Sequence, residues 1–177
     1  MWVLMRWLAI AGLGIFIMAS DANARDLENT IYLDLKDGRV VIVLRPDLAP
    51  NHVARIKELA REGFYDGLKW HRVIDGFMAQ TGDPKGNGTG GSGQNIKAEF
   101  SDESHVRGTV SMARSQRPDS ADSQFFIVFA PSSWLDREYT VWGQVTEGMD
   151  FVDQIKKGEG QSGSVDDPVD VIVRMQV

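Results

Sequence analysis

Hydrophobic and polar residues alternate along several short runs of the chain, which is the pattern of β-strands with one buried face. The run 30–35 (TIYLDL) is followed by Asp37-Gly38 and by a second apolar run, RVVIVL, so a β-hairpin is predicted here. Further strands are expected between turn residues at 69–74, 77–81, 108–113, 124–129, 141–145 and 169–177.

Two other segments show the spacing of about 3.6 residues that places apolar side chains on one face of a helix. Pro50 is suited to the first turn of one helix and Gly63 to its end, and residues 148–157 form the other. Short strands with two isolated helices predict a mostly β fold, an antiparallel barrel or sandwich, rather than alternating strands and helices. No repeat or linker divides residues 25–177, which we expect to form one domain.

Residues 1–24 differ from the rest of the chain. Arg6 precedes an apolar run of about 13 residues, which is shorter than the roughly 20 that a membrane-spanning helix needs. Ala22-Asn23-Ala24 supplies a small-x-small cleavage site. We therefore expect residues 1–24 to be a signal peptide that directs the mature chain to the bacterial periplasm, with no stable membrane insertion after cleavage. An uncleaved amphiphilic anchor is the alternative.

Composition narrows the possible chemistry. With 42% hydrophobic and 25% charged residues among 177, the chain has a globular balance, and its formal net charge of −6 argues against general binding of nucleic acid. Without cysteine it has no disulfide, thiolate nucleophile or thiolate metal ligand. His52, His71 and His105 lack the spacing of a helical zinc site, so no metal and no cofactor is expected.

Two catalytic or binding patterns are weak here. No serine lies in a G-x-S-x-G elbow, the motif that places a catalytic serine in many hydrolases. A serine triad that uses His71 remains an alternative. We expect His71 instead to be a half-buried strand residue with a satisfied hydrogen bond. The stretch 82–93 (GDPKGNGTGGSG) matches G-x-G-x-x-G, but Asp83-Pro84 precedes the glycines and no helical periodicity follows. A nucleotide site is not expected, and a long mobile loop is the alternative.

Amide and apolar side chains gather in sequence around one arginine. The stretch WHRVIDGFMAQTGD places Arg72 on a predicted strand, and DSQFFIVF forms another strand. Alternation sends Gln124 and Phe126 to one side of that strand and Phe125 to the other. We expect Phe125, like Phe129 and Trp142, in the core, and Arg72 at the rim of a pocket.

At these residues the chain resembles the cyclophilin family of peptidyl-prolyl cis-trans isomerases. The resemblance covers nearly the whole chain after residue 24 and rests on FYDGLKWHRVIDGFMAQTGDP, GNGTGG, GTVSMAR, SQFFIVF, WLD and YTVWGQVTEGMDFVDQI, in family order and spacing. It implies a closed eight-stranded antiparallel barrel capped by two α-helices. It also implies isomerisation of X-Pro bonds in proline-containing polypeptides by a monomer, without covalent chemistry.

The resemblance carries site residues over to this sequence. It implies catalytic roles for Arg72 and Gln80, and Trp134 matches the tryptophan associated with cyclosporin-type inhibitors. The substrate-binding residues that it implies are Phe77, Met78, Gly88, Ala113, Arg114, Ser115, Gln124, Phe126, Trp134, Leu135 and Tyr139. Arg114 and Tyr139 stand where many animal members carry asparagine and histidine, and bacterial members are more similar to this chain there.

Two other classes of protein are weighed against the enzyme. A peptide-binding chaperone would use the same groove without catalysis and would not need the Arg72 donor. A lipocalin-like carrier would need an open interior, whereas the inward-facing residues of this chain are bulky enough to fill a small barrel.

Overall fold

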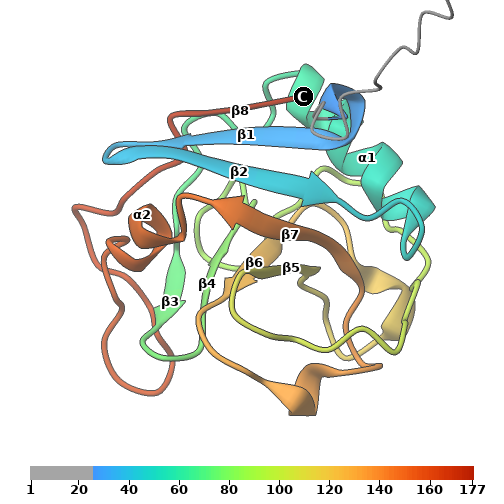
Figure 1. The fold of residues 1–177 in the computed structure, drawn as a ribbon. Coiled ribbons are helices and arrows are strands. Elements are labelled where there is room, and N and C mark those ends of the chain that lie inside the picture. Colours follow the sequence, from blue (N-terminus) through green and yellow to red (C-terminus); the bar gives the residue numbers. More distant parts are fainter. Residues whose placement is uncertain (1–25) are drawn as a thin grey trace, which may run out of the picture.

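The computed structural model describes residues 26–177, so the expected signal peptide lies outside the described residues. The described chain is mostly β with two α-helices (Figure 1). The strands are β1 (Thr30–Leu35), β2 (Gly38–Leu44), β3 (Arg72–Ile74), β4 (Met78–Thr81), β5 (Thr109–Met112), β6 (Phe125–Val128), β7 (Val141–Glu147) and β8 (Arg174–Gln176). The helices are α1 (Pro50–Arg61) and α2 (Met149–Asp153), and three single 3-10 turns are η1 (Leu27–Asn29), η2 (Pro118–Ser120) and η3 (Ser133–Leu135).

All eight strands belong to one antiparallel sheet in the order β3-β4-β6-β5-β7-β2-β1-β8. The predicted hairpin is confirmed, because β1 and β2 pair from Thr30↔Val43 to Leu35↔Gly38 across a two-residue turn. Figure 1 shows this hairpin crossing the top of the molecule, with β8 above β1 and β7 beneath β2. The mostly β class therefore follows the sequence pattern.

The sheet is a half-barrel, and the expected closure of eight strands is wrong. No ladder joins the outer strands β3 and β8 in the described chain; isolated bridges such as Lys69↔Val171 lie between them instead. The N–H of Ile172 donates to Leu68 O, whereas that of Val173 donates to Asp34 O on β1. Residues 170–172 bond to residues 67–70 outside any ladder, so only β8 is a regular part of the predicted strand 169–177.

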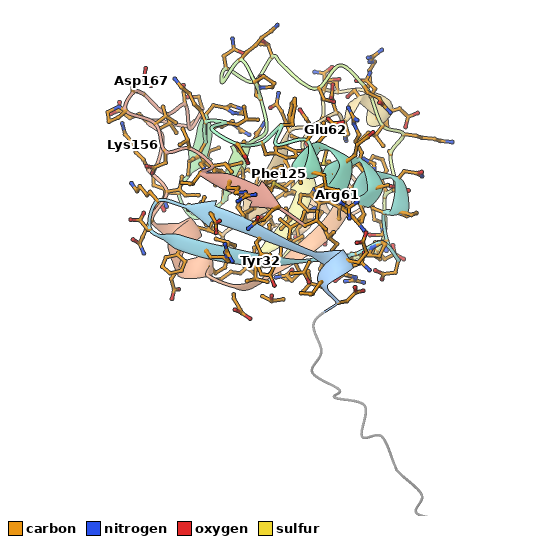
Figure 2. All side chains as sticks on the ribbon, turned by 90° about the horizontal axis from the view of Figure 1, so that it is seen from above. Tyr32, Arg61, Glu62, Phe125, Lys156 and Asp167 are labelled. Carbon is orange, nitrogen blue, oxygen red and sulfur yellow. The ribbon has the colours of Figure 1, made fainter. Side chains whose placement is uncertain are left out.

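The core lies inside the curved sheet and beneath the helices. Phe125 is fully buried there and meets Tyr65, Trp70 and Trp142 edge to face, at ring-centroid distances of 5.6, 6.2 and 5.4 Å. Figure 2 shows Phe125 among the strands, away from the rim where Lys156 and Asp167 lie. Phe129 joins the same cluster, so the three expected core aromatics are confirmed. Bulky side chains fill the space that a lipocalin-like carrier would leave open.

The two helices cover different strands. Helix α1 packs against β8 and β7, and its buried stripe contains Val53, Ile56 and Leu59, as the spacing predicts. Helix α2 packs against β2 but ends at Asp153, short of the predicted end. The N–H groups of Lys156 and Gly158 have tertiary partners instead of helical ones. Lys156 N donates to the Asp170 carboxylate, and Gly158 N donates to Val73 O on β3.

Residues 26–177 lack two features, a membrane-spanning helix and a cluster of metal-ligating side chains. None of their helices has the length and apolar content needed to cross a bilayer. Nowhere in the same residues do three or more histidine, aspartate or glutamate side chains meet in a group that could hold a metal ion.

Candidate active site

An apolar pocket lies on the face of β4 and β6 opposite the core. Met78 and Phe126 are 2% and 5% exposed and form a second hydrophobic cluster with Val128 and Leu135, separate from the main core. Phe77 packs against it as a partly buried side chain. The alternation of β6 produces this separation, since Phe125 and its neighbour Phe126 point to opposite faces of the sheet. Four of the expected substrate-binding residues are therefore brought together: Phe77, Met78, Phe126 and Leu135.

This pocket is the floor of a groove of about 930 Å³ that opens to solvent. An adjoining hollow of about 320 Å³ shares Gln80, Gly88, Ala113 and Arg114 with it. Every expected site residue lines one or both: Arg72, Phe77, Met78, Gln80, Gly88, Ala113, Arg114, Phe126, Trp134, Leu135 and Tyr139 line the groove, and Ser115 and Gln124 line the hollow. The groove is of the size of a small-ligand site.

Arg72 begins β3 at the edge of this groove. Its Nε donates to Ser162 O at 3.0 Å and its Nη1 to Gln80 Oε1 at 3.1 Å. Gln80 lies opposite it in the β3–β4 pairing, which sets their spacing. Two of the five guanidinium N–H groups are thus used for orientation, and within residues 26–177 Nη2 makes no hydrogen bond. A charged donor with free N–H groups remains next to the apolar pocket.

A chain of amides continues from Arg72 across the sheet. Gln80 Nε2 donates to Gln124 Oε1 at 3.0 Å, and Gln124 Nε2 donates to Gly90 O at 2.8 Å. Each glutamine uses its oxygen to accept from one neighbour and its NH₂ group to donate to the next. The two expected groove glutamines therefore fix the arginine to the glycine loop.

The glycine loop is built around a carboxylate of the protein itself. The Asp83 side chain is fully buried and accepts from the N–H groups of Lys85, Asn87 and Gly88 at 2.8, 3.1 and 2.6 Å. Burial raises the pKa of Asp83, but these N–H groups and that of Gly90 outweigh it, so the pKa lies below its ordinary value. The N–H groups of the glycine loop are therefore used by a carboxylate of the protein itself.

A second carboxylate holds the end of the same loop. The Asp122 carboxylate accepts from the backbone N–H of Ser92 at 2.8 Å, from the Ser92 hydroxyl at 2.5 Å and from the backbone N–H of Gly93 at 2.9 Å. A Cβ on Gly91 would overlap the Asp122 side chain. The glycines let the backbone approach two carboxylates closely, while Gly88 remains on the groove side, with only His71 near its missing Cβ.

His71 differs from its expectation. It lies immediately before β3 and is only 7% exposed, so it is more deeply buried than expected, and neither ring nitrogen makes a hydrogen bond of ordinary geometry with a residue of 26–177. The irregular backbone at 163–165 packs across it, since Val165 N donates to His71 O. Burial lowers the pKa of His71, and the Asp83 carboxylate opposes the shift only in part. No serine hydroxyl in the described chain bonds to it, so the serine-nucleophile alternative lacks its base.

A serine–histidine–aspartate arrangement does occur elsewhere. His105 Nδ1 lies 2.9 Å from Asp136 Oδ1 and its Nε2 lies 3.1 Å from Ser111 Oγ. The Ser111 side chain is fully buried, and its hydroxyl donates to Thr140 O at 2.8 Å. A hydroxyl that no substrate can reach is not a nucleophile, so this arrangement is structural.

Several groove residues were not found by sequence reasoning. Ser162, Ser164 and Val165 line it from the segment between α2 and β8, and Asn87 and Glu138 line it from loops. The segment 158–168 has no periodicity, so no local signal placed it over β3. Backbone bonds between 158–165 and 71–73, together with the bond from Arg72 Nε to Ser162 O, bring it there.

Comparison with known proteins places this geometry in a family. The sequence model of the cyclophilin type peptidyl-prolyl cis-trans isomerases matches residues 30–177. The chain belongs to the cyclophilin family. The resemblance drawn from the motifs is confirmed, as is the enzyme class, peptidyl-prolyl cis-trans isomerase.

Bacterial relatives are similar over most of their length. This cyclophilin is 57% identical over 164 residues to a probable peptidyl-prolyl cis-trans isomerase of Brucella suis, with 85% of this chain and 84% of the relative covered. It is 45% identical over 133 residues to peptidyl-prolyl cis-trans isomerase B of Bacillus subtilis, with 73% and 92% covered.

Solved cyclophilins have the same fold. A Cryptosporidium parvum cyclophilin type isomerase, solved in the presence of the dipeptide Ala-Pro, superposes with a TM-score of 0.75 at 25% identity, with 84% of this chain and 98% of that chain covered. A cyclophilin from Hirschia baltica superposes with a TM-score of 0.73 at 29% identity, with 84% and 73% covered.

Proposed function

We propose that this cyclophilin rotates X-Pro bonds of polypeptides that lie in the groove, with the proline ring against Phe126 and Met78 and the Arg72 guanidinium at the prolyl nitrogen. The observation that carries the proposal is the position of Arg72, a charged donor held by Gln80 next to an apolar pocket. The relative solved with Ala-Pro supports a proline-containing ligand for such a groove.

The reaction needs a donor rather than a nucleophile. Rotation about X-Pro breaks amide resonance against a barrier of about 18–20 kcal/mol, and no covalent bond has to break. As resonance is lost, the prolyl nitrogen becomes pyramidal and accepts a hydrogen bond more strongly. A donor aimed at that nitrogen binds the twisted state more tightly than either planar state, which lowers the barrier.

The remaining residues orient the peptide and exclude water. Gln80 fixes the Arg72 side chain, and Gln124 fixes Gln80. A rate increase of about 10⁵-fold needs roughly 7 kcal/mol, whereas one charged hydrogen bond contributes about 1.5–3 kcal/mol. The apolar pocket and the contacts on both sides of the proline must therefore supply the rest through desolvation and positioning.

Replacement of the donor tests this proposal. Arg72→Ala should lower kcat/KM about 10²- to 10³-fold in a protease-coupled assay on an Ala-Pro peptide, because the transition-state hydrogen bond is lost. Urea unfolding should show that the variant still folds, since Arg72 is outside the core. Arg61→Ala is the matched control: this exposed arginine at the end of α1 (Figure 2) does not line the groove and pairs with Glu28.

The outcomes separate enzyme from binder. A folded Arg72→Ala variant that isomerises at the wild-type rate contradicts the assignment of the donor. A wild-type protein that binds the peptide without accelerating isomerisation shows a peptide-binding module instead.

We further propose the location and an inhibitor for this enzyme. The composition of residues 1–24 supports export to the periplasm, which N-terminal sequencing of protein from periplasmic extracts tests: a mature start at Arg25 is expected, and a start at Met1 contradicts it.

Trp134 is 65% exposed beside Phe77, which supports a contact with cyclosporin-type inhibitors. Failure of the drug to inhibit at high micromolar concentration contradicts that contact.

A further inference from the structure

The side chain of Arg114 lies at the groove but faces the protein. Its side chain is only 11% exposed. Nε donates to Glu138 O at 2.9 Å, Nη1 donates to Ser115 O at 2.9 Å and to Gln116 O at 3.3 Å, and Nη2 lies 3.2 Å from a Glu138 carboxylate oxygen. Every guanidinium nitrogen is thus engaged within the protein. Four of its five N–H groups are used in this way, which leaves one N–H of Nη2.

Two aromatic rings flank the same guanidinium. Its carbon lies 4.8 Å from the centroid of Tyr139 and 5.7 Å from that of Phe100. A guanidinium within about 6 Å of a ring centroid is attracted to the face of that ring, so both contacts favour the observed ring positions. We call Arg114 with Phe100, Glu138 and Tyr139 the Arg114 cluster. It joins the loop after β5 to the turn before β7.

The Arg114 cluster reaches the proline pocket through Tyr139. The Tyr139 ring meets Phe126 edge to face, at 5.7 Å between centroids and 82° between planes. On another side, His105 stacks on Phe126 at 6.3 Å and 19°, and Asp136 and Ser111 hold that histidine. Phe126, the central ring of the pocket, therefore has its position set by Tyr139 and His105.

We propose that Arg114 is a positioning residue, which sets the width of the proline pocket through Tyr139 and does not read the charge of the substrate. This inference rests on the proposed function of the groove. Two features favour it over a charge-reading role: the guanidinium nitrogens are all engaged, and the ionic partner Glu138 is exposed, so that pair alone adds little. A lysine at position 114 would keep the positive charge. It could not reproduce the planar guanidinium, which lies near two rings and donates to three carbonyl oxygens.

The first test is a kinetic series on Arg114→Ala and Arg114→Lys. Both should raise KM for an Ala-Pro peptide roughly five- to tenfold and leave kcat within about twofold, because a loosened pocket weakens ground and transition states alike. The loss should be equal for Glu-Pro and Lys-Pro peptides. Restoration by lysine, or a loss confined to Glu-Pro peptides, overturns the inference in favour of a charge contact.

The second test asks whether Arg114 acts through Tyr139. In a double-mutant cycle with Tyr139→Leu, the double variant should lose no more affinity than the more impaired single variant, because both changes release the same ring. Multiplicative losses overturn the proposed route. Arg117→Ala is the matched control, since it removes an arginine from the same loop whose guanidinium has no hydrogen bond or ion pair within residues 26–177.

The dissociation constant of the Ala-Pro dipeptide, measured by NMR titration, gives a readout besides turnover. It should rise by the same five- to tenfold factor in Arg114→Ala and Arg114→Lys, and unchanged affinity overturns the inference. Thermal unfolding of each variant checks that the fold is kept. If the wild type does not isomerise proline peptides, the proposed function fails, and the affinity series still decides the role of Arg114.

Discussion

At the scale of single residues, Asp83 has more influence on the groove than its sequence suggests. Asp83-Pro84 looks like an ordinary turn, yet the carboxylate is buried without a cation and is stabilised by backbone N–H groups of the loop that follows. The same loop provides Gly90 O, to which Gln124 bonds, and Gln124 in turn holds Gln80 and through it Arg72. A surface loop and the proposed catalytic donor are therefore connected through one buried anion.

We expect Asp83→Asn to lower the free energy of unfolding by about 1–3 kcal/mol at pH 7, because an amide accepts these hydrogen bonds less strongly than a carboxylate. Since the pKa of Asp83 is lowered on folding, its stabilisation is complete above the ordinary aspartate value of about 3.9 and is lost as pH falls through the folded value. Urea unfolding at pH 7 and pH 3 should thus show a difference between wild type and variant that shrinks in acid.

The control for this comparison is Asp102→Asn, which removes a carboxylate that is 84% exposed and paired with Arg137. It should change stability little. A difference at pH 3 as large as at pH 7 for Asp83→Asn contradicts the role of the ionised carboxylate.

At the scale of elements, helix α1 is stabilised by a residue far away in the sequence. Pro50 opens the helix, as expected, but Ala49 before it has no side chain that could cap the N–H groups. Glu99 serves instead: its carboxylate accepts from the N–H groups of Asn51 and His52 at 3.1 and 3.0 Å, and His52 Nδ1 lies 2.6 Å from it. The helix start thus depends on the loop that follows the glycine stretch.

We expect Glu99→Ala to lower the free energy of unfolding by about 1–2 kcal/mol, because the first turn of α1 loses its cap. Turnover on proline peptides should stay at the wild-type level while the protein is folded, since Glu99 lies outside the groove. Glu62→Ala, at the exposed far end of the same helix (Figure 2), is the control, and the helix dipole predicts no loss there. Equal destabilisation by both variants would show that the cap has no special role.

At the scale of the whole molecule, the buried histidines link stability to pH. Burial of the His52 ring lowers its pKa although Glu99 opposes the shift, and burial likewise lowers the pKa of His71. Both rings are thus neutral in the fold near pH 7. A guanidinium does not titrate in proteins, so the proposed donor Arg72 keeps its charge over the same range.

We expect stability and kcat/KM to be constant from about pH 7 to 9, since neither histidine nor Arg72 changes charge there. Because the unfolded chain takes up histidine protons first, stability should be complete above the ordinary histidine value of about 6.5 and fall as pH drops below it. Urea midpoints and kcat/KM measured in parallel across this range check the expectation. A kcat/KM that rises or falls through a single ionisation between pH 7 and 9 contradicts a mechanism without a general base.

The sequence by itself determined the strands, the helix faces and the residue types of the groove. Alternation along β6 places Phe125 in the core and Phe126 in the pocket, because the period of a strand is a local property of its backbone. The family resemblance carried by the motifs likewise implied that Arg72, Gln80 and Gln124 share one site, and the structure connects them by hydrogen bonds.

The tertiary structure decided what depends on partners distant in the chain. Whether the sheet closes, where β8 begins and which segment covers β3 are set by backbone hydrogen bonds to segments distant in the chain, such as those between 170–172 and 67–70, and local pattern does not encode these partners. The role of Arg114 is of the same kind. The family resemblance implied a contact of Arg114 with substrate, whereas folding brings Phe100, Tyr139 and the carbonyls of Ser115, Gln116 and Glu138 to its guanidinium.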